Sequence, residues 1–355
     1  MIELPSQRAV PIPAQSGVQA VRGSSGNPIG ILDGLEAEFA RRWPDGVTGL
    51  DAVHRYAVIP PGKLLRPLLV VYAALTVGGE LSSVLPAAAG IEGVHVGSLM
   101  HDDIIDRDTQ RRGRAAVHAA FGRAQAIVAG NALYFSWFAA LAECAERGVP
   151  TDRIARALEV QAGAGVTICR GAFDELAMRG GLDLSVDDYL AMARGKTAAL
   201  LQAACRIGSI LGGGDNPTTD LLGAFGDHLG IAFQIRDDLL PYDPATTGLT
   251  GKPADSDLRN HCPTLPVLLA HQRADPAGRA ALRHTLLNEA DPRTALRRMR
   301  ALLDETGALE AAHAMADHHA QLARDAISQL PSTAHTHALA LLTLPPSETT
   351  RPAPA

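Results

Sequence analysis

Residues 101–113 read HDDIIDRDTQRRG and follow an apolar run at 85–100 that has helical spacing. On a helix, Asp102 and Asp106 lie four residues apart on one face, with Asp103 three residues before Asp106. Carboxylates this close repel each other at neutral pH and favour a cation among them. Mg²⁺ suits such ligands, because it binds through a few carboxylates together with substrate phosphates. A solvated acidic helix end followed by a basic turn remains the simpler explanation of a lone motif of this kind.

A second acidic pair stands far downstream in a similar setting. Residues 233–241 read FQIRDDLLP and close another helical run at 221–240, so Asp237 and Asp238 also end an apolar helix. The two acidic ends could face each other across a cavity and hold several Mg²⁺ ions against one diphosphate. The paired arginines of the first stretch are well shaped for phosphate oxygens. Spacing alone leaves this arrangement and two unrelated acidic surfaces equally open.

The composition limits the class of protein. It is 46% hydrophobic and only 4% aromatic, which is typical of packed helices, and its net charge of −6 predicts no nucleic-acid partner. The four cysteines are widely spaced and form no CxxC pair, which argues against a zinc site or a disulfide framework and suits a reducing compartment. No apolar run approaches the roughly 20 residues of a membrane span, and no signal peptide is visible. We therefore expect a soluble cytoplasmic protein.

Glycine and proline divide the chain into a succession of apolar helical runs, without an alternating strand pattern. We expect one all-α domain at residues 28–344. Residues 1–27 and 345–355 are rich in Pro, Ser and Thr or Gln without periodicity, so we expect disordered tails there.

Five motifs, in order along residues 60–270, resemble the signatures of the trans-isoprenyl diphosphate synthases, or polyprenyl synthetases. They are Pro61-Gly62-Lys63-x-x-Arg66-Pro67, Asp102-Asp103-x-x-Asp106 with Arg111-Arg112-Gly113, Lys196-Thr197, Phe233-Gln234-x-x-Asp237-Asp238, and Gly251-Lys252-Pro253 with Asp257-Leu258 and Thr264-Leu265-Pro266. Each motif is weak alone, but five in family order are very specific. The resemblance implies a single large helical bundle around a central cavity and a homodimer.

The resemblance also implies a reaction, in which isopentenyl diphosphate condenses with an allylic diphosphate to give a linear isoprenyl diphosphate. Ionisation would be assisted by about three Mg²⁺ ions, held by Asp102, Asp103, Asp106, Asp237 and Asp238. Isopentenyl diphosphate would be bound by Lys63, Arg66, His95 and Arg112. The allylic diphosphate would be bound by Arg111, Lys196, Thr197, Gln234 and Lys252. Catalytic roles in the ionisation would fall to Asp102, Asp103, Arg111, Lys196, Thr197, Gln234 and Asp237.

Two of these assignments have support from the residues themselves. Lys63 and Arg66 stand at the start of a helical run, where the helix dipole disfavours cations, so a bound anion would relieve them. An ordinary surface turn explains the pair as well. His95 shares a helix face with Asp102, two turns away, although a lone histidine on an apolar helix is more often a satisfied core residue.

Gly97 and Ser98 lie one to one and a half turns before Asp102. In the family, bulky aromatic residues at these places block the growing chain. Small residues leave the channel open, so the resemblance implies a product of C20 or longer.

The chain departs from the family pattern at three places. Ala172 replaces a glutamine, Pro241 replaces a third aspartate and Cys262 replaces a lysine, while Glu175 takes the place of an aspartate and could still orient a lysine. Pro241 lacks an N–H group, so the helix should kink or end there.

These departures leave two alternatives to the synthase open. One is a related enzyme that cyclises the allylic substrate or transfers it to another acceptor. The other is a non-catalytic subunit that regulates a partner synthase. The intact set of residues for isopentenyl diphosphate argues against the first alternative, and the intact first aspartate motif argues against the second.

Overall fold

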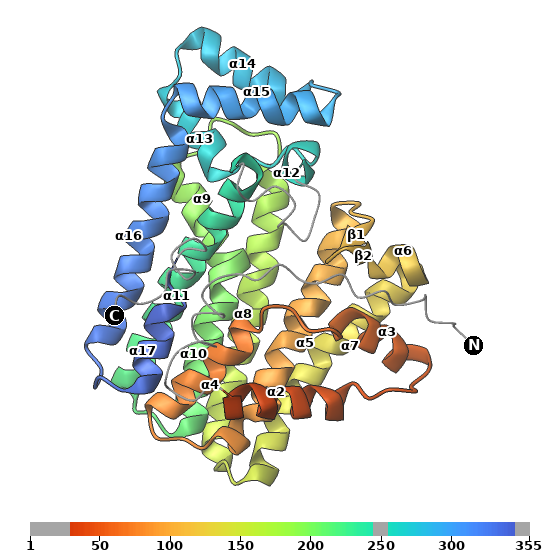
Figure 1. Cartoon of the computed structure of the whole chain (residues 1–355), viewed down its shortest axis with the longest axis vertical. Helices are drawn as coiled ribbons and strands as arrows, with labels where there is room; N and C mark the ends of the chain where they lie inside the picture. Colours follow the sequence, from red (N-terminus) through yellow and green to blue (C-terminus); the bar gives the residue numbers. More distant parts are fainter. Residues whose placement is uncertain (1–28, 244–254, 345–355) are drawn as a thin grey trace. The chain divides into compact units, whose positions relative to one another are not determined.

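The computed structural model describes residues 29–243 and 255–344 (Figure 1). Most of these residues are helical, which confirms the all-α prediction. The tails predicted at 1–27 and 345–355 and the predicted ligand Lys252 lie outside the described residues. The chain forms two compact units, and the prediction of one domain over 28–344 stays a prediction.

The first unit takes residues 1–164, 201–226 and 323–355, as far as they are described. Its own helices and strands are α2 (Ile29–Arg42), α3 (Gly49–Val58), α4 (Leu65–Thr76), α5 (Leu81–Ile105), β1 (Gln110–Arg111), β2 (Arg114–Ala115), α6 (Val117–Phe121), α7 (Arg123–Glu143), η1 (Cys144–Arg147) and α17 (Ala334–Leu341).

The second unit takes residues 165–200 and 227–322. Its own elements are α9 (Val186–Ala193), the π-helical turn η2 (Arg194–Ala198), η3 (Leu240–Tyr242), α12 (Ser256–Arg259), α13 (Leu265–Arg273), α14 (Pro276–Leu287) and α15 (Pro292–Glu305). Four helices contribute residues to both units, namely α8 (Thr151–Met178), α10 (Ala199–Gly212), α11 (Asn216–Leu239) and α16 (Ala308–Ser328).

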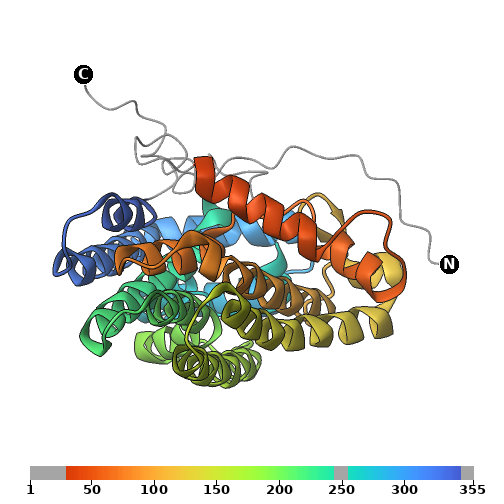
Figure 2. The same cartoon turned by 90° about the horizontal axis from the view of Figure 1, so that it is seen from below.

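Helix α5 is the buried centre of the first unit, because it is apolar on nearly every side and packs against α4 and α7. Figure 2 shows α5 and α7 running side by side. The two helices approach closely at glycines. A Cβ atom on Gly90 would lie 2.6 Å from the Cβ of Ala140, and one on Gly97 would lie 3.0 Å from the carbonyl oxygen of Gly130. Packing against α7 therefore requires a small residue at position 97, independently of the predicted role of Gly97 in product length.

Helix α7 corrects the expectation that no apolar run approaches the length of a membrane span. By length and composition, the segment Arg123–Arg147 is long and apolar enough to cross a membrane. Only 39% of its apolar 18-residue stretch is buried. The sequence inspection missed it because scattered polar residues interrupt the run, yet no charged residue stands between Arg123 and Glu143. A single such helix is weak evidence for a span, since core helices pass the same test. α7 packs against α5, and part of its other face is exposed.

The second unit has its own apolar core. Residues of α9, α11, α13 and α15 meet there, including Tyr189, Ile235, Leu268 and Met299, all of them fully buried. Helix α11 ends at Leu239, and Pro241 lies in the short helix η3 that follows. The predicted helix end at this proline is therefore confirmed.

Candidate active site

The first acidic motif ends helix α5. Asp102 and Asp106 are partly exposed, whereas the side chain of Asp103 is buried. Arg111 holds Asp103, because its Nε donates to Oδ1 at 2.9 Å and its Nη2 donates to the same oxygen. Burial raises the pKa of Asp103 to about 6, although Arg111 acts in the opposite direction. Asp103 is thus paired inside the protein, and the other two carboxylates lie nearer to solvent.

A short hairpin carries the two arginines of this motif. Strands β1 and β2 pair antiparallel with Arg111 opposite Arg114. The two residues between them, Arg112 and Gly113, have φ values of 53° and 74°. Such two-residue turns need positive φ at both positions, which glycine adopts freely and arginine adopts with strain. Strained non-glycine residues are often found at functional sites. The sequence did not predict β1 and β2, because strands of two residues are too short to show an alternating pattern.

A buried charge cluster, here called the Glu92 cluster, consists of Arg66, Glu92, His95 and Arg112. Glu92 is 2% exposed, and its Oε1 lies 3.8 Å from Nη2 of Arg112. Burial raises the pKa of Glu92, while Arg112 and Arg66 lower it. Burial also lowers the pKa of Arg66 to about 10, although Glu92 raises it. Two arginines therefore share one buried carboxylate.

The Glu92 cluster has unused hydrogen-bond donors. Nε of Arg66 and Nη1 of Arg112 are buried and have no hydrogen-bond partner in the structure. A buried donor without a partner costs roughly 1–3 kcal/mol, and more when it is charged. An anion bound between the two guanidinium groups would remove this cost.

Two further residues shape the cluster. Burial, followed by Arg66 and Arg112, lowers the pKa of His95 well below its usual value, so the imidazole is neutral at pH 7. Gly62 lies directly beside Arg112, because a Cβ atom on Gly62 would be 2.6 Å from Nη2 of that arginine. The glycine of the first signature therefore makes room for the second arginine.

In the second unit, helix α8 meets the turn η2. A Cβ atom on Gly171 would lie 2.2 Å from the backbone nitrogen of Lys196, so only glycine fits there. This close approach lets Glu175 accept a hydrogen bond from Nζ of Lys196 at 2.5 Å. The expectation that Glu175 could orient a lysine agrees with this contact. A π-helical turn inside a run of α-helix is frequent at functional sites.

The second acidic pair is unequal in its burial. Asp237 is partly exposed, and Asp238 is buried. Asp238 accepts hydrogen bonds from Tyr189, Gln234 and the backbone of Leu265. Burial raises the pKa of Asp238 to about 7, with a further contribution from nearby Asp257. Gln234 in turn accepts a hydrogen bond from the hydroxyl of Thr197.

The carboxylates fit one mode of divalent-metal binding. In residues 29–243 and 255–344, no three His, Cys, Asp or Glu side chains are close enough together to form a metal cage. Mg²⁺ rarely uses such a cage and instead takes one or two carboxylates, several waters and substrate phosphates. The partly exposed carboxylates of Asp102, Asp106 and Asp237 have the donor chemistry for this mode.

The structure brings several predicted residues together within each unit. Arg66, His95 and Arg112 meet in the first unit, and so do Asp103 and Arg111. Lys63 lies in the loop before α4. The hydroxyl of Ser98 bonds to the carbonyl oxygen of His95 at 2.8 Å. In the second unit the predicted residues in contact are Thr197, Gln234 and Asp238, and Lys196 pairs with Glu175.

Sequence reasoning missed two residues. Glu92 lies three residues before His95, and a lone acid in an apolar run on the histidine's face was a usable signal. Tyr189 gave no signal, because a tyrosine in a helix is an ordinary core residue.

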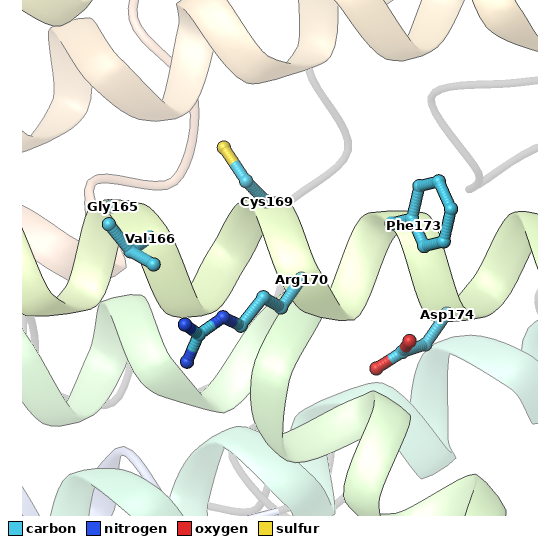
Figure 3. A pocket seen from close by; sticks show the side chains of 6 residues that line it. All are labelled: Gly165, Val166, Cys169, Arg170, Phe173 and Asp174. Carbon is cyan, nitrogen blue, oxygen red and sulfur yellow. The ribbon is translucent and has the colours of Figure 1, made fainter.

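An open pocket of about 410 Å³ runs along α8 in the second unit. Figure 3 shows Cys169 and Phe173 on one side of the helix and Arg170 and Asp174 on the other. The pocket has a single carboxylate, so its chemistry does not suit a diphosphate bound through metal ions.

Comparison with known proteins matches the sequence of this chain to one family. The sequence profile described as polyprenyl synthetase matches residues 47–303. A geranylfarnesyl diphosphate synthase of Aeropyrum pernix is 35% identical over 85% of this chain and 93% of its own length. An octaprenyl diphosphate synthase of Haemophilus influenzae is 33% identical over 80% of this chain and 83% of its own.

Solved structures agree with the sequence matches. A polyprenyl synthase of Caulobacter crescentus, in complex with calcium and isoprenyl diphosphate, superposes with a TM-score of 0.82 at 31% identity. The alignment covers 94% of this chain and 98% of that chain. These matches confirm the resemblance that the five motifs predicted.

Proposed function

Since the chain belongs to the polyprenyl synthetase family and is a trans-prenyltransferase making linear isoprenyl diphosphates, we propose that it condenses isopentenyl diphosphate with an allylic diphosphate. The observation that carries the proposal is the pair of buried guanidinium nitrogens without partners, on Arg66 and Arg112. Guanidinium groups bind phosphate oxygens through paired N–H donors, so two of them suit a diphosphate. The product we propose is C20 or longer, with Ser98 as the small residue that supports it, since packing against α7 explains Gly97.

In the proposed reaction, Lys63, Arg66, His95 and Arg112 bind isopentenyl diphosphate. Its anionic oxygens accept hydrogen bonds from the two arginine nitrogens that have no partner, and neutral His95 offers one further N–H donor. Glu92 balances the positive charge of this site, because it is the acid that both arginines share. The substrate is thereby held in one orientation, with its double bond free to react.

The allylic diphosphate is bound in this proposal by the cations Arg111, Lys196 and Lys252. Gln234 and Thr197 complete the site, and the carbonyl of Thr197 stabilises the allylic cation. The family uses a divalent metal, and calcium is bound in the Caulobacter crescentus relative. We propose Mg²⁺, about three ions per site, which when bound neutralises charge on the leaving diphosphate.

The metal ligands we propose are the partly exposed carboxylates Asp102, Asp106 and Asp237. The sequence also predicted Asp103 and Asp238, but the protein already holds both through hydrogen bonds. Their oxygens would have to exchange these donors for a metal.

The proposed reaction begins with ionisation of the allylic substrate. Its C–O bond breaks, and the cationic side chains stabilise the negative charge that grows on the departing diphosphate. The double bond of isopentenyl diphosphate then forms a C–C bond to the allylic carbon. A proton is lost to the released diphosphate, so no side-chain nucleophile is needed. Apolar walls keep water from the cation.

A homodimer belongs to the proposal, and helix α7 supports it. Val128, Phe135 and Phe138 are 60%, 74% and 42% exposed on this helix. No charge stands between Arg123 and Glu143 to solvate them. An exposed apolar face of this kind marks an interface, and an uncharged face can pair with its own copy about a two-fold axis.

Sedimentation velocity tests the homodimer. The protein should sediment with about twice the chain mass of 37.2 kDa, and Phe135→Asp should halve that mass. A wild-type monomer would contradict the proposal, and binding to lipid vesicles by this face would point to a membrane instead.

We also propose a cytoplasmic location. All four cysteines of the chain are free, with Cys144 and Cys205 buried, which suits a reducing compartment.

The reaction is tested with purified protein, Mg²⁺ and labelled isopentenyl diphosphate. C5, C10, C15 and C20 allylic primers are supplied separately, and the dephosphorylated products are sized by mass spectrometry. Linear alcohols extended by C5 units are expected, and their length tests the C20 proposal. A primer consumed to a hydrocarbon without incorporation would indicate a cyclase. No consumption would indicate a non-catalytic subunit, and both results would overturn the proposal.

A further inference from the structure

The hydroxyl of Tyr189 is aimed at the second acidic pair. Tyr189 lies on α9, is fully buried, and donates a hydrogen bond to Oδ2 of Asp238 at 2.7 Å. The backbone N–H of Leu265 donates to the same oxygen at 3.3 Å. Nε2 of Gln234 donates to Oδ1 at 2.8 Å. Both oxygens of Asp238 therefore accept hydrogen bonds from the protein.

The hydrogen bonds extend from Asp238 through Gln234 to Thr197. Its hydroxyl donates to Oε1 of Gln234, so the amide of Gln234 is held at both ends. Asp238 accepts from the NH₂ end and Thr197 donates to the oxygen end, which leaves one orientation for the amide. We call the four residues Tyr189, Asp238, Gln234 and Thr197 the Asp238 network.

Asp237 differs from its neighbour. It is partly exposed, whereas Asp238 is 5% exposed and surrounded by donors. A Mg²⁺ ligand must turn an oxygen to the ion and its waters. A buried carboxylate with three donors is instead typical of the outer layer that orients the groups around a metal.

We infer that Tyr189 and Asp238 are positioning residues, which fix Gln234 and Thr197 for the departing diphosphate and leave Asp237 as the metal ligand of the pair. The inference rests on the proposed function, since it assigns roles within the same site. It also assigns a role to Tyr189, which a purely structural reading would treat as part of the core.

The test compares two buried tyrosines. Tyr189→Phe removes only the hydroxyl that reaches Asp238. Tyr72→Phe is the matched control, because Tyr72 is a buried tyrosine of α4. Binding of inorganic diphosphate at saturating Mg²⁺ is measured by calorimetry, and kcat and KM are measured for each substrate.

Tyr189→Phe should weaken diphosphate binding about tenfold, which is the usual effect of losing an outer-layer partner. It should lower kcat by a similar factor and leave the KM for isopentenyl diphosphate unchanged. Tyr72→Phe should change none of these values. Equal behaviour of the two variants would overturn the inference, because a core role alone predicts it.

A second comparison separates positioning from metal binding. Asp237→Asn should raise the Mg²⁺ concentration for half-maximal diphosphate binding at least tenfold. Asp238→Asn should weaken diphosphate binding at saturating Mg²⁺ and change the half-maximal Mg²⁺ concentration by less than twofold. If Asp238→Asn raised the half-maximal Mg²⁺ concentration as much as Asp237→Asn does, Asp238 would be a metal ligand and the inference would be overturned. If Asp238→Asn does not fold, Tyr189→Phe decides the question.

Failure of the inference and failure of the proposed function can be told apart. Diphosphate binding needs no turnover. A wild-type protein that binds magnesium diphosphate through this network but never incorporates isopentenyl diphosphate would overturn the function and retain the inference. A wild-type protein that binds no magnesium diphosphate would overturn both.

Discussion

Arg112 places its Nη2 atom 3.8 Å from the buried carboxylate of Glu92, and Nη1 of the same arginine has no partner. One side of the guanidinium group thus faces a fixed acid, while the other can receive an anion.

Glu92→Gln should destabilise the protein without ligand, because it leaves two buried arginines without their acid. The expected loss in the free energy of unfolding is about 3 kcal/mol. Added isopentenyl diphosphate should recover more of this stability in the variant than it adds to the wild type, since it supplies negative charge. Denaturant unfolding with and without the ligand measures both effects.

The control for Glu92 is Glu143→Gln, which removes a partly exposed acid paired with Arg41 and Arg42. It should cost less than about 1 kcal/mol. Equal losses in the two variants would show that Glu92 carries no special charge balance.

Gly62→Ala should displace the guanidinium of Arg112, because the new Cβ would lie 2.6 Å from its Nη2. The end of an arginine moves easily, so the melting temperature should barely change. The KM for isopentenyl diphosphate should rise about tenfold, since small misplacements of a binding group are costly. The KM for the allylic primer should stay the same. Gly30→Ala is the control, because a Cβ there meets nothing within 4 Å, and an unchanged KM in Gly62→Ala would contradict the prediction.

Asp102→Ala should lower turnover by at least about a hundredfold, because a ligand of the metal that stabilises the leaving diphosphate is lost. The circular-dichroism spectrum and melting should stay nearly the same, since Asp102 is partly exposed. Asp187→Ala, at an exposed aspartate in the first turn of α9, is the control. Near-normal turnover in Asp102→Ala would remove the first acidic motif from the mechanism.

His319 should make stability depend on pH. Its Nδ1 lies 3.2 Å from Nδ1 of His228, and burial, His228 and His318 lower its pKa from 6.5 to about 4. The unfolded chain then binds a proton more readily than the folded protein. Stability is therefore complete above pH 6.5 and falls progressively from there towards pH 4.

Between pH 7 and pH 5 the wild type should lose about 1–2 kcal/mol through His319. His319→Gln should remove most of that loss, and His313→Gln, at an exposed histidine of the same helix, should retain it. Denaturant unfolding at the two pH values measures the difference. A pH dependence that is the same in both variants would show that His319 does not titrate as expected.

The sequence by itself determined most of the helices and the class of reaction. Apolar periodicity predicted the helical runs at 85–100 and 221–240, which correspond to α5 and α11, because it depends on local spacing. Pro241 ended α11 as predicted, because its ring and missing N–H act locally. The motif order was enough to recognise the family.

Tertiary structure alone decided which charged groups are buried and what holds them. Asp102 and Asp103 are neighbours in one motif, yet only Asp103 is buried against Arg111. Asp237 and Asp238 differ in the same way, since Tyr189 comes from another helix. Spacing along a helix gives the face on which a residue lies. What fills that face depends on segments far away in the chain, and those contacts determine the charge, burial and role of each carboxylate.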